Sequence, residues 1–288
     1  MEKIVIIGAG PAGISAALYA ARANKDPLVL DNGIGALEKA ERIENYYGFP
    51  DFPSGKELYE RGLEQARALG VRIQKTQVLG ISGFDTFEIH VTEGSIEAES
   101  VILATGAKRK SLPLPGLREL EGRGVSYCAV CDAFFYRGKS TAVLGNGDFA
   151  LHEAGELENL SARVTILTNG LDTEFSKECT FPVDNRKILR IEGEDSVDRV
   201  VFEDGETMDM DGIFVALGTA GSAEIARQMG AELTDRGHVA VDDAMQTTIP
   251  GLFAAGDCTG GLLQVAKAVY EGSLAGINAG KYVKNRNS

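Results

Sequence analysis

The residues of this chain best suited to chemistry are two cysteines with two residues between them and an acid directly after the second. They are Cys128, Cys131 and Asp132, in the segment SYCAVCDAFF at 126–135. A zinc site would need further Cys or His ligands at matching spacing, and the other two cysteines stand alone. A permanent crosslink across two residues closes a very small loop and therefore gains little entropy. These observations favour a redox-active dithiol over a metal site or a structural crosslink.

Disulfide exchange requires a thiolate that attacks a sulfur, and a CxxC arrangement lowers the pKa of a thiol below its usual value of about 8.5. Asp132 directly follows the second cysteine and could give or take the proton as a thiolate leaves. The alternative interpretation of Asp132 is a solvated carboxylate in a turn. We predict that Cys128, Cys131 and Asp132 are catalytic, and we interpret Cys179 and Cys258 as ordinary small side chains.

The N-terminal segment KIVIIGAGPAG at 3–13 predicts a short strand, a glycine-rich turn and the start of a helix. In such a turn the first glycine allows a tight bend, the second lets the backbone approach a pyrophosphate, and the third lets the helix pack on the strand. About 20 residues later, where such a unit places an acid for the ribose, a second strand ends in Asp31. The predicted dinucleotide-binding residues of this unit are Gly8, Gly10, Pro11, Ala12, Gly13 and Asp31.

Residues 141–154, TAVLGNGDFALHEA, repeat the strand, glycine turn and helix, and RVTILTNG follows as a second strand. That strand ends in Thr168 and Asn169, which offer neither a carboxylate for a ribose hydroxyl nor an arginine for a 2′-phosphate. Phe149 also adds a bulky ring to the turn. Two interpretations remain: a working dinucleotide site, or a retained fold that binds dinucleotides weakly or not at all.

The remaining segments predict how these units are built. Ser54 and Glu57 form a capping-box pattern at the start of a helix. Alternating patterns at 71–105 and again at 186–216 predict two small antiparallel meanders, the second of which includes MDGIFVALG. We predict an α/β fold with two Rossmann-like, three-layer ββα nucleotide-binding domains, the second inserted into the first. The predicted domains are residues 1–110 with 240–288, which carry the first glycine turn, and residues 111–239, which carry the cysteines.

Composition excludes several function classes. With 288 residues the chain suits roughly two domains, and its 44% hydrophobic and 25% charged residues are ordinary for a globular protein. The formal net charge of -13 argues against nucleic-acid binding, which relies on Lys and Arg. No apolar run approaches the roughly 18 residues of a membrane span, and the N-terminus runs directly into a strand pattern. We therefore expect no nucleic acid, no membrane, no metal and a cytoplasmic location.

The chain resembles the low-molecular-weight thioredoxin reductases over nearly its whole length. The segments that carry the resemblance are GAGPAG at 8–13, ENYYGFP at 44–50, VILATGA at 101–107, YCAVCD at 127–132, GNGDFALHEA at 145–154, GLFAAGDC at 251–258 and GLLQVAKAVYEG at 261–272. The resemblance implies FAD held by the first domain, an NADPH-binding central domain with the cysteines, a thioredoxin-like protein as substrate, and a homodimer.

The resemblance also implies roles for individual residues. Gly8, Gly10 and Gly13 would hold the FAD pyrophosphate, and Asp31 its adenosine ribose. The rest of the cofactor would be bordered by Asn45, Thr105, Gly106, Gly256, Asp257 and Gln264. Cys131 would lie nearest the isoalloxazine, and Cys128 would attack the protein disulfide.

Two departures from the family pattern put NADPH in doubt. A His-Arg-Arg cluster normally ends the strand after the second glycine turn, and this chain has Ile-Leu-Thr-Asn-Gly at 166–170. Leu263 stands where an arginine usually precedes the glutamine. These features resemble the ferredoxin-dependent flavin thioredoxin reductases, so ferredoxin is the expected electron donor.

Several alternatives stay open. Lys108-Arg109-Lys110 could form a basic patch for an acidic ferredoxin, although a solvated loop also explains these charges. The other candidate functions are an NAD(P)H-dependent thioredoxin reductase, an oxygen-linked FAD dithiol oxidase, and a flavin redox sensor without turnover.

Overall fold

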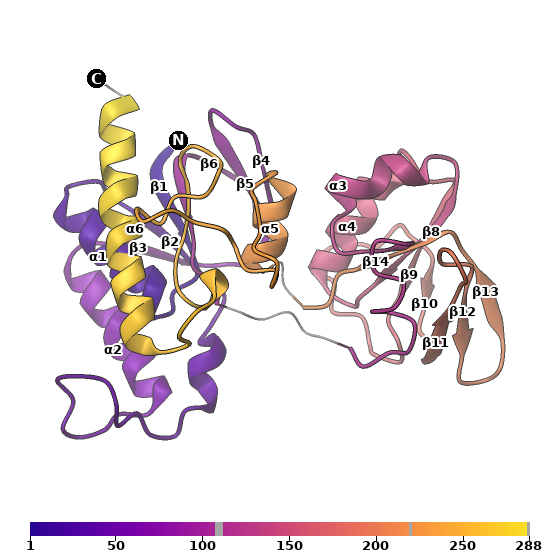
Figure 1. The fold of residues 1–288 in the computed structure, drawn as a ribbon, viewed down its shortest axis with the longest axis horizontal. Coiled ribbons are helices and arrows are strands. Elements are labelled where there is room, and N and C mark those ends of the chain that lie inside the picture. The colour runs from indigo at the N-terminus through magenta and orange to yellow at the C-terminus, as the bar shows by residue number, and fades with distance from the viewer. Residues whose placement is uncertain (107–111, 219–220, 287–288) are drawn as a thin grey trace. The chain divides into compact units, whose positions relative to one another are not determined.

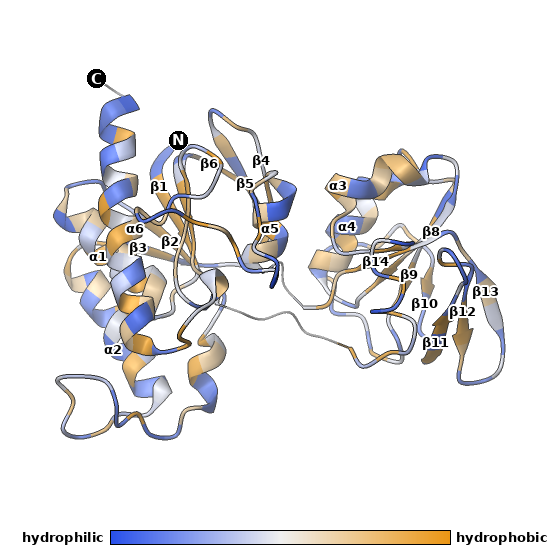
Figure 2. Ribbon diagram, viewed as in Figure 1, coloured by the Kyte–Doolittle hydropathy of each residue, from blue (hydrophilic) through white to orange (hydrophobic). Residues whose placement is uncertain are grey.

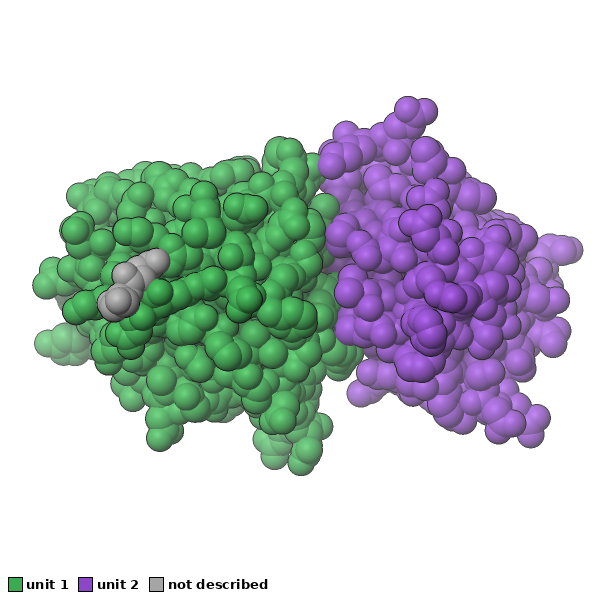
Figure 3. Space-filling model, turned by 90° about the horizontal axis from the view of Figure 1, so that it is seen from above, with its two compact units in different colours: residues 1–108, 221–288 green, residues 109–220 purple. Residues whose placement is uncertain are grey.

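A computed structural model describes residues 1–106, 112–218 and 221–286, and the chain divides into two compact units (Figure 3). Unit 1 comprises residues 1–108 and 221–288, and unit 2 comprises residues 109–220. The sequence-based boundaries put 221–239 in the second domain; instead, helix α5 (Ser222–Gln228) packs against strand β4 (Val78–Ser82) of unit 1. The first boundary and the Lys108-Arg109-Lys110 patch fall within 107–111, outside the described residues.

Unit 1 is built on a sheet with strand order β3-β2-β1-β6-β5-β4, in which β15 also pairs with β6 (Figure 1). Its strands are β1 (Glu2–Ile7), β2 (Leu28–Asp31), β3 (Arg72–Lys75), β4, β5 (Phe87–Val91), β6 (Gly94–Leu103) and β15 (Leu252–Ala254). The pairs that join β3, β2, β1, β6 and β15 are parallel, whereas β4, β5 and β6 pair antiparallel. The meander predicted over 71–105 is therefore right for β4 to β6 and wrong for β3, which pairs in parallel with β2. The carboxyl ends of the parallel strands therefore meet at one edge, where open α/β sheets bind ligands.

Helices cover this sheet. They are α1 (Pro11–Arg22), α2 (Gly55–Ala68), α5 and α6 (Val265–Arg286), with short 3-10 turns η1 (Gly35–Lys39) and η3 (Asp257–Thr259). The predicted capping box at α2 is confirmed, because the Glu57 N–H donates to Ser54 Oγ at 3.2 Å and the Ser54 N–H donates to Glu57 Oε2 at 2.7 Å. Such a cap stabilises a helix by about 1 kcal/mol.

Unit 2 combines a parallel sheet of order β10-β9-β8-β14-β7 with an antiparallel sheet β11-β12-β13. The strands are β7 (Val125–Ser126), β8 (Ser140–Leu144), β9 (Arg163–Leu167), β10 (Val183–Asp184), β11 (Ile188–Glu192), β12 (Arg199–Phe202), β13 (Thr207–Asp209) and β14 (Gly212–Val215); the helices are α3 (Ala129–Asp132), η2 (Ala133–Tyr136) and α4 (Asp148–Glu158). The α/β fold class with two parallel-sheet units is confirmed. The placement of MDGIFVALG in a meander is wrong, because the fully buried β14 lies between β8 and β7 in the parallel sheet.

Hydrophobic residues concentrate along the strands inside each unit (Figure 2). Among the described residues no helix is long and apolar enough to cross a membrane. Within that same part of the chain, no group of three or more His, Cys, Asp or Glu side chains could hold a metal ion.

Small residues let α1 and α6 approach closely, and they lie side by side in Figure 1. A Cβ on Gly272 would lie 2.1 Å from the Ala12 carbonyl oxygen, and one on Gly276 would lie 2.3 Å from that of Ala16. Both distances are far below a possible contact. The helix that follows β15 is thereby locked against the helix that follows β1.

Gly276→Ala is expected to destabilise unit 1 by roughly 1–3 kcal/mol, since overpacking against backbone forces the helices apart. Gly280→Ala is the matched control in the same helix, because its Cβ would make an ordinary contact at 3.6 Å with a Lys25 side-chain carbon. That control should gain up to about 1 kcal/mol from helix propensity. Urea denaturation followed by circular dichroism measures both, and equal effects would contradict the packing argument.

Candidate active site

Cys128 and Cys131 form a disulfide at the start of α3. Cys128 is the N-cap residue of this short helix, and its Sγ accepts a hydrogen bond from the Cys131 N–H at 3.1 Å. That N–H would also stabilise a thiolate on Cys128 after reduction. Cys128 is 1% exposed, whereas Cys131 is partly exposed. The expected attack by Cys128 therefore requires this sulfur to become accessible during turnover.

A serine that the sequence analysis missed connects Asp132 to the cysteines. The buried Ser126 donates from its hydroxyl to Asp132 Oδ2 at 2.6 Å. The same hydroxyl oxygen accepts from the Cys128 N–H at 3.1 Å. The available signal was the position of Ser126 two residues before Cys128, the spacing of a turn closed by a serine side chain.

A second carboxylate beside the dithiol was also missed. Glu153 on α4 is 1% exposed, and its Oε2 accepts from the Ala129 N–H at 2.7 Å. This bond attaches the first turn of α3 to the helix that follows the second glycine turn. Nothing in the local sequence pairs these two residues, which are separated by a strand.

The first glycine turn has the geometry that a pyrophosphate requires. Gly8 has φ +108° and a Cβ there would lie 2.4 Å from the Ala104 carbonyl oxygen, while a Cβ on Gly13 would lie 1.8 Å from that of Gly8. At Gly10, by contrast, a Cβ would meet nothing within 4 Å. Gly10 precedes Pro11 and caps α1 without a side-chain hydrogen bond, so no capping side chain takes the first N–H groups of the helix. Gly8 and Gly13 are thus packed against backbone, whereas the space beside Gly10 is free for a phosphate.

Asp31, at the end of β2, is held in one orientation. Its Oδ1 accepts from the Gly33 N–H at 2.8 Å, and the Tyr59 hydroxyl lies 2.7 Å from both carboxylate oxygens. Burial, followed by the hydrogen bond to Asp31, raises the pKa of Tyr59 above its ordinary value. Tyr59, on α2, was not found from the sequence because it lies 28 residues from its partner.

Thr105 follows β6 and is joined to the start of α5. Its Oγ1 lies 2.7 Å from Ser222 Oγ and accepts from the Ser222 N–H at 2.8 Å. Ser222 also hydrogen-bonds Cys258, whose thiol pKa burial raises to about 11. Cys258 is therefore a buried thiol of the core, as the sequence analysis expected. Gly106, with φ +82°, completes the turn after Thr105.

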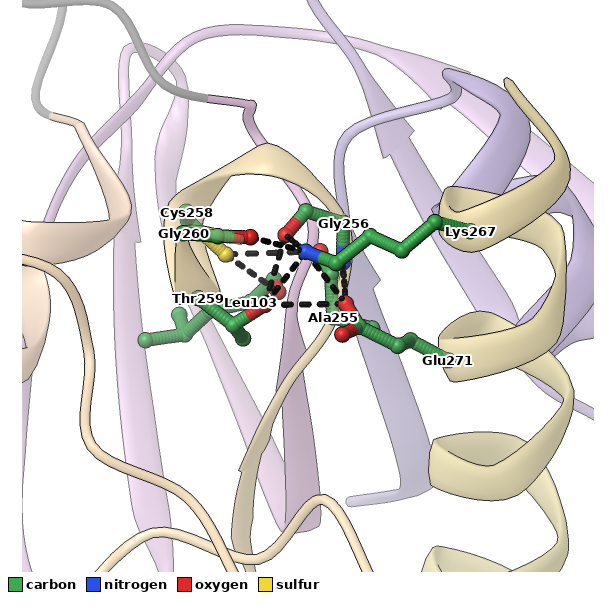
Figure 4. A network of polar contacts seen from close by, with 8 residues as sticks. All are labelled: Leu103, Ala255, Gly256, Cys258, Thr259, Gly260, Lys267 and Glu271. Atoms are coloured by element: carbon green, nitrogen blue, oxygen red, sulfur yellow. Dashed lines mark hydrogen bonds and ion pairs between the residues drawn. The ribbon is translucent and has the colours of Figure 1, made fainter. Parts of the chain in front are cut away.

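A partly buried charged network closes the loop between β15 and α6 (Figure 4). Lys267 Nζ donates to the carbonyl oxygens of Gly256 at 2.8 Å and Gly260 at 2.5 Å, and to the Thr259 hydroxyl at 2.8 Å. It also lies 3.0 Å from Glu271 Oε2, which accepts from the Gly256 N–H at 2.8 Å. The Lys267–Glu271 ion pair thus holds both backbone polar groups of Gly256, the carbonyl oxygen through Lys267 and the N–H through Glu271.

This network was missed, although Lys267 and Glu271 have the i,i+4 spacing of a helical ion pair. The predicted residue Asp257 lies within the loop, and burial raises its pKa while Lys267 opposes that rise. Two other predicted residues, Asn45 and Gln264, contact each other, because Asn45 Nδ2 donates to Gln264 Oε1 at 2.8 Å.

The residues of unit 1 fit an FAD. The open glycine turn, the oriented carboxylate of Asp31 and the fixed Gly256 loop all belong to the carboxyl edge of one parallel sheet. The glycine turn, Asp31 and the Gly256 loop thus follow neighbouring strands of this sheet at the same edge.

The second glycine turn, in unit 2, differs from the first because polar groups in and beside it accept hydrogen bonds from other segments of the chain. The Asn146 carbonyl oxygen accepts from the Glu174 N–H at 2.7 Å, and Asp148 Oδ1 accepts from the Ser176 N–H at 2.7 Å. After β9, Asn169 Oδ1 accepts from the Ile188 N–H at 2.7 Å. The side chains of Asp148 and Asn169 thus already accept hydrogen bonds from the chain's own backbone.

Lys267→Met is expected to destabilise unit 1 by about 3–5 kcal/mol, because it leaves the carboxylate of Glu271 without its counter-charge. The Lys267 and Glu271 side chains are only 15% and 12% exposed. Lys56→Met is the control, because Lys56 and its i,i+4 partner Glu60 are 75% and 56% exposed. This variant should change the free energy of unfolding by no more than about 0.5 kcal/mol. Urea midpoints measure the two variants, and losses of equal size would refute a special role for the network.

Comparison with known proteins is consistent across sequence and structure. The family model described as "Pyridine nucleotide-disulphide oxidoreductase" matches residues 2–272. A thioredoxin reductase from Listeria innocua is 36% identical over 302 residues, which cover 98% of this chain and 93% of that protein. The atypical thioredoxin reductase TRi from Desulfovibrio vulgaris Hildenborough is 40% identical, with a TM-score of 0.94 and 99% of both chains covered. A ferredoxin-flavin thioredoxin reductase from Clostridium acetobutylicum is 33% identical, with a TM-score of 0.72, 99% of this chain and 98% of that chain covered.

Proposed function

Because this chain belongs to the pyridine nucleotide-disulphide oxidoreductases and is a flavin disulfide reductase of the thioredoxin reductase type, we propose that it reduces a thioredoxin-like protein with electrons from ferredoxin rather than NADPH. The observation that supports the reductase chemistry is the Cys128–Cys131 disulfide, next to which the Ser126 hydroxyl holds Asp132 by a hydrogen bond. The homodimer is part of the proposal and rests on the resemblance alone.

FAD is the cofactor that the family implies. When bound, it supplies a group that can accept electrons singly and pass them on as a pair. The residues that would hold it are Gly8, Gly10, Pro11, Ala12 and Gly13 at the pyrophosphate, Asp31 at the adenosine ribose, and Asn45, Thr105, Gly106, Gly256, Asp257 and Gln264 along the remainder. Tyr59 supports Asp31, and the Lys267–Glu271 pair supports the Gly256 loop.

The dithiol chemistry follows from the chain's own residues. Two electrons and two protons open the disulfide; one proton is then held by Cys131 and the other by the Asp132 carboxyl group, so that Cys128 is a thiolate. The Cys128 thiolate attacks one sulfur of the substrate disulfide, a mixed disulfide forms, and the leaving sulfur takes a proton from Asp132. Cys131 then attacks Cys128 Sγ, which releases the second substrate thiol and restores the disulfide.

Exposed apolar side chains beside the dithiol support a protein substrate. Phe134 and Phe135 in η2 are 66% and 68% exposed, and Val130 lies between the two cysteines. Aromatic side chains are the usual anchors of protein interfaces. A thioredoxin-like protein could therefore dock its own disulfide against this surface of unit 2.

The polar groups around the second glycine turn support a donor other than NADPH. Asn169 stands where a 2′-phosphate would need a cation, and its side-chain oxygen is used by Ile188. Asn146 of the turn hydrogen-bonds the backbone of the exposed residues Asp172 and Glu174. The negative charges of these two side chains would repel a phosphate bound at the turn. The likeness to the clostridial ferredoxin-flavin enzyme favours ferredoxin as the replacement.

Reduction by ferredoxin is thermodynamically favourable. A plant-type ferredoxin near about −400 mV lies roughly 130 mV below a thioredoxin disulfide near about −270 mV. For two electrons this difference corresponds to about 6 kcal/mol.

An NAD(P)H-dependent thioredoxin reductase is the second candidate. The description of the matching family favours it, and unit 2 retains the parallel strands and glycine turn of a dinucleotide-binding domain. Backbone groups alone would then have to bind the nucleotide.

Cys128→Ser and Cys131→Ser are each expected to abolish reduction of a thioredoxin disulfide while the protein stays yellow. The reason is that each change removes one sulfur of the exchange but none of the residues assigned to FAD. Absorbance spectra and a thioredoxin reduction assay measure the two properties. Cys179→Ser is the control and should keep both; loss of flavin from the Cys128 and Cys131 variants would mean that the pair is structural.

Anaerobic mixing with NADPH and then with reduced ferredoxin tests the donor. We expect at least a hundredfold faster loss of the visible flavin absorbance with reduced ferredoxin, because Asn169 ends the strand where a cation would meet a 2′-phosphate and its side-chain oxygen is already bonded to the Ile188 N–H. A thioredoxin reductase known to use NADPH serves as the positive control. Rapid stoichiometric bleaching at micromolar NADPH would reject the ferredoxin proposal in favour of the second candidate.

A further inference from the structure

Three polar groups beside the disulfide form a connected chain. The Cys128 N–H donates to Ser126 Oγ, and the Ser126 hydroxyl donates to Asp132 Oδ2 at 2.6 Å. The Ser126 oxygen also lies 3.3 Å from the Cys128 carbonyl oxygen. A single hydroxyl thus connects the carboxylate of Asp132 to both backbone polar groups of one cysteine.

We propose that Ser126 is a positioning residue for proton transfer, whose hydroxyl holds the Asp132 carboxyl group beside the dithiol so that it can protonate the leaving sulfur. This inference rests on the proposed function, in which Asp132 is the acid. In the balanced step, the Cys128 thiolate forms a bond to one substrate sulfur, the substrate S–S bond breaks, and the departing thiolate takes the proton from the Asp132 carboxyl group. Asp132 is left as a carboxylate.

The hydroxyl suits both protonation states of Asp132. When Asp132 is ionised, Ser126 donates to Oδ2, as it does in the structure. When Asp132 is protonated on Oδ1, the same hydroxyl can keep donating to Oδ2, so the acidic proton stays available to the leaving sulfur. No heavy atom has to move, so the carboxyl group keeps its place through the proton transfer.

Other titratable groups of the described part of unit 2 lie near the dithiol. Tyr136 in η2 feels Asp132 and Asp211, and its pKa is raised by burial and then by these two charges. On α4, which packs against α3, Glu153 accepts from the Ala129 backbone N–H and His152 is its neighbour in the sequence. Asp132 is the carboxylate of this group that a hydroxyl bridges to Cys128.

The test compares, in each variant against wild type, two disulfides whose leaving sulfurs differ strongly in their need for a proton. The full-length flavoprotein is reduced with dithiothreitol, desalted without oxygen, and mixed with either bis(2-hydroxyethyl) disulfide or 5,5′-dithiobis(2-nitrobenzoate). The first releases a basic alkyl thiolate, which benefits from a proton donor; the second releases an acidic aromatic thiolate, which does not. The readout is the ratio of the two rates, which general damage to the site would leave unchanged.

Ser126→Ala is expected to slow the reaction with the alkyl disulfide about tenfold and the reaction with the aromatic disulfide less than twofold. Asp132→Asn should slow the alkyl reaction about a hundredfold. Adding Ser126→Ala to Asp132→Asn should produce no further change, because the serine acts through the acid. Ser126→Thr keeps the hydroxyl and should keep the wild-type ratio.

Each other outcome has a definite meaning. A Ser126→Ala variant that slows both reactions equally, or that adds its full effect to Asp132→Asn, overturns the inference and makes the serine structural. An unchanged ratio in Asp132→Asn shows that Asp132 is not the acid, which overturns the inference and that part of the proposed function together. Failure of the reduced wild-type protein to react with either disulfide would instead refute the redox role of the cysteine pair.

Discussion

Parallel pairing of β6 with β1 on one side and β15 on the other is the constraint on which the rest of unit 1 depends. Ile7 and Ala254 both pair with Leu103, so segments from opposite ends of the sequence finish at one level of the sheet. Gly8, Thr105 and Gly256 follow these strands and are brought to one edge by the pairing alone. The same pairing explains how unit 2 can be inserted, because β6 and β15 restore the sheet on either side of it.

The two units share a strand, turn and helix plan but use their polar groups differently. The second glycine of each turn, Gly10 in unit 1 and Gly147 in unit 2, leaves open space where a Cβ would stand. In unit 1 the strand that follows ends in the oriented carboxylate of Asp31. In unit 2 Asp148 and Asn169 already accept backbone hydrogen bonds. What differs is the side chain after the second strand, which is a carboxylate at Asp31 in unit 1 and an amide bonded to the Ile188 N–H at Asn169 in unit 2. The shared fold therefore does not imply a shared binding capacity.

The sequence predicted features that depend on neighbouring residues and missed those that depend on packing. The glycine turns, the capping box and the cysteine pair are local, and the fold class and the disulfide reductase class inferred from them are confirmed. Tyr59 and Glu153 were missed because their partners come from other elements. The misassigned β14 has the opposite cause: a short apolar run can join an antiparallel or a parallel sheet, and only the neighbouring strands decide which.

Two carboxylates border the dithiol, and their partners give them different capacities for proton chemistry. Glu153 is deeply buried and accepts from a backbone N–H, a donor that has no lone pair to offer if the carboxyl group gains a proton. Asp132 is partly exposed and bonded to a hydroxyl, which can reverse its role from donor to acceptor by rotating one hydrogen. The bond to Ala129 accordingly suits Glu153 to holding the helix in place, whereas the bond to Ser126 suits Asp132 to carrying a proton.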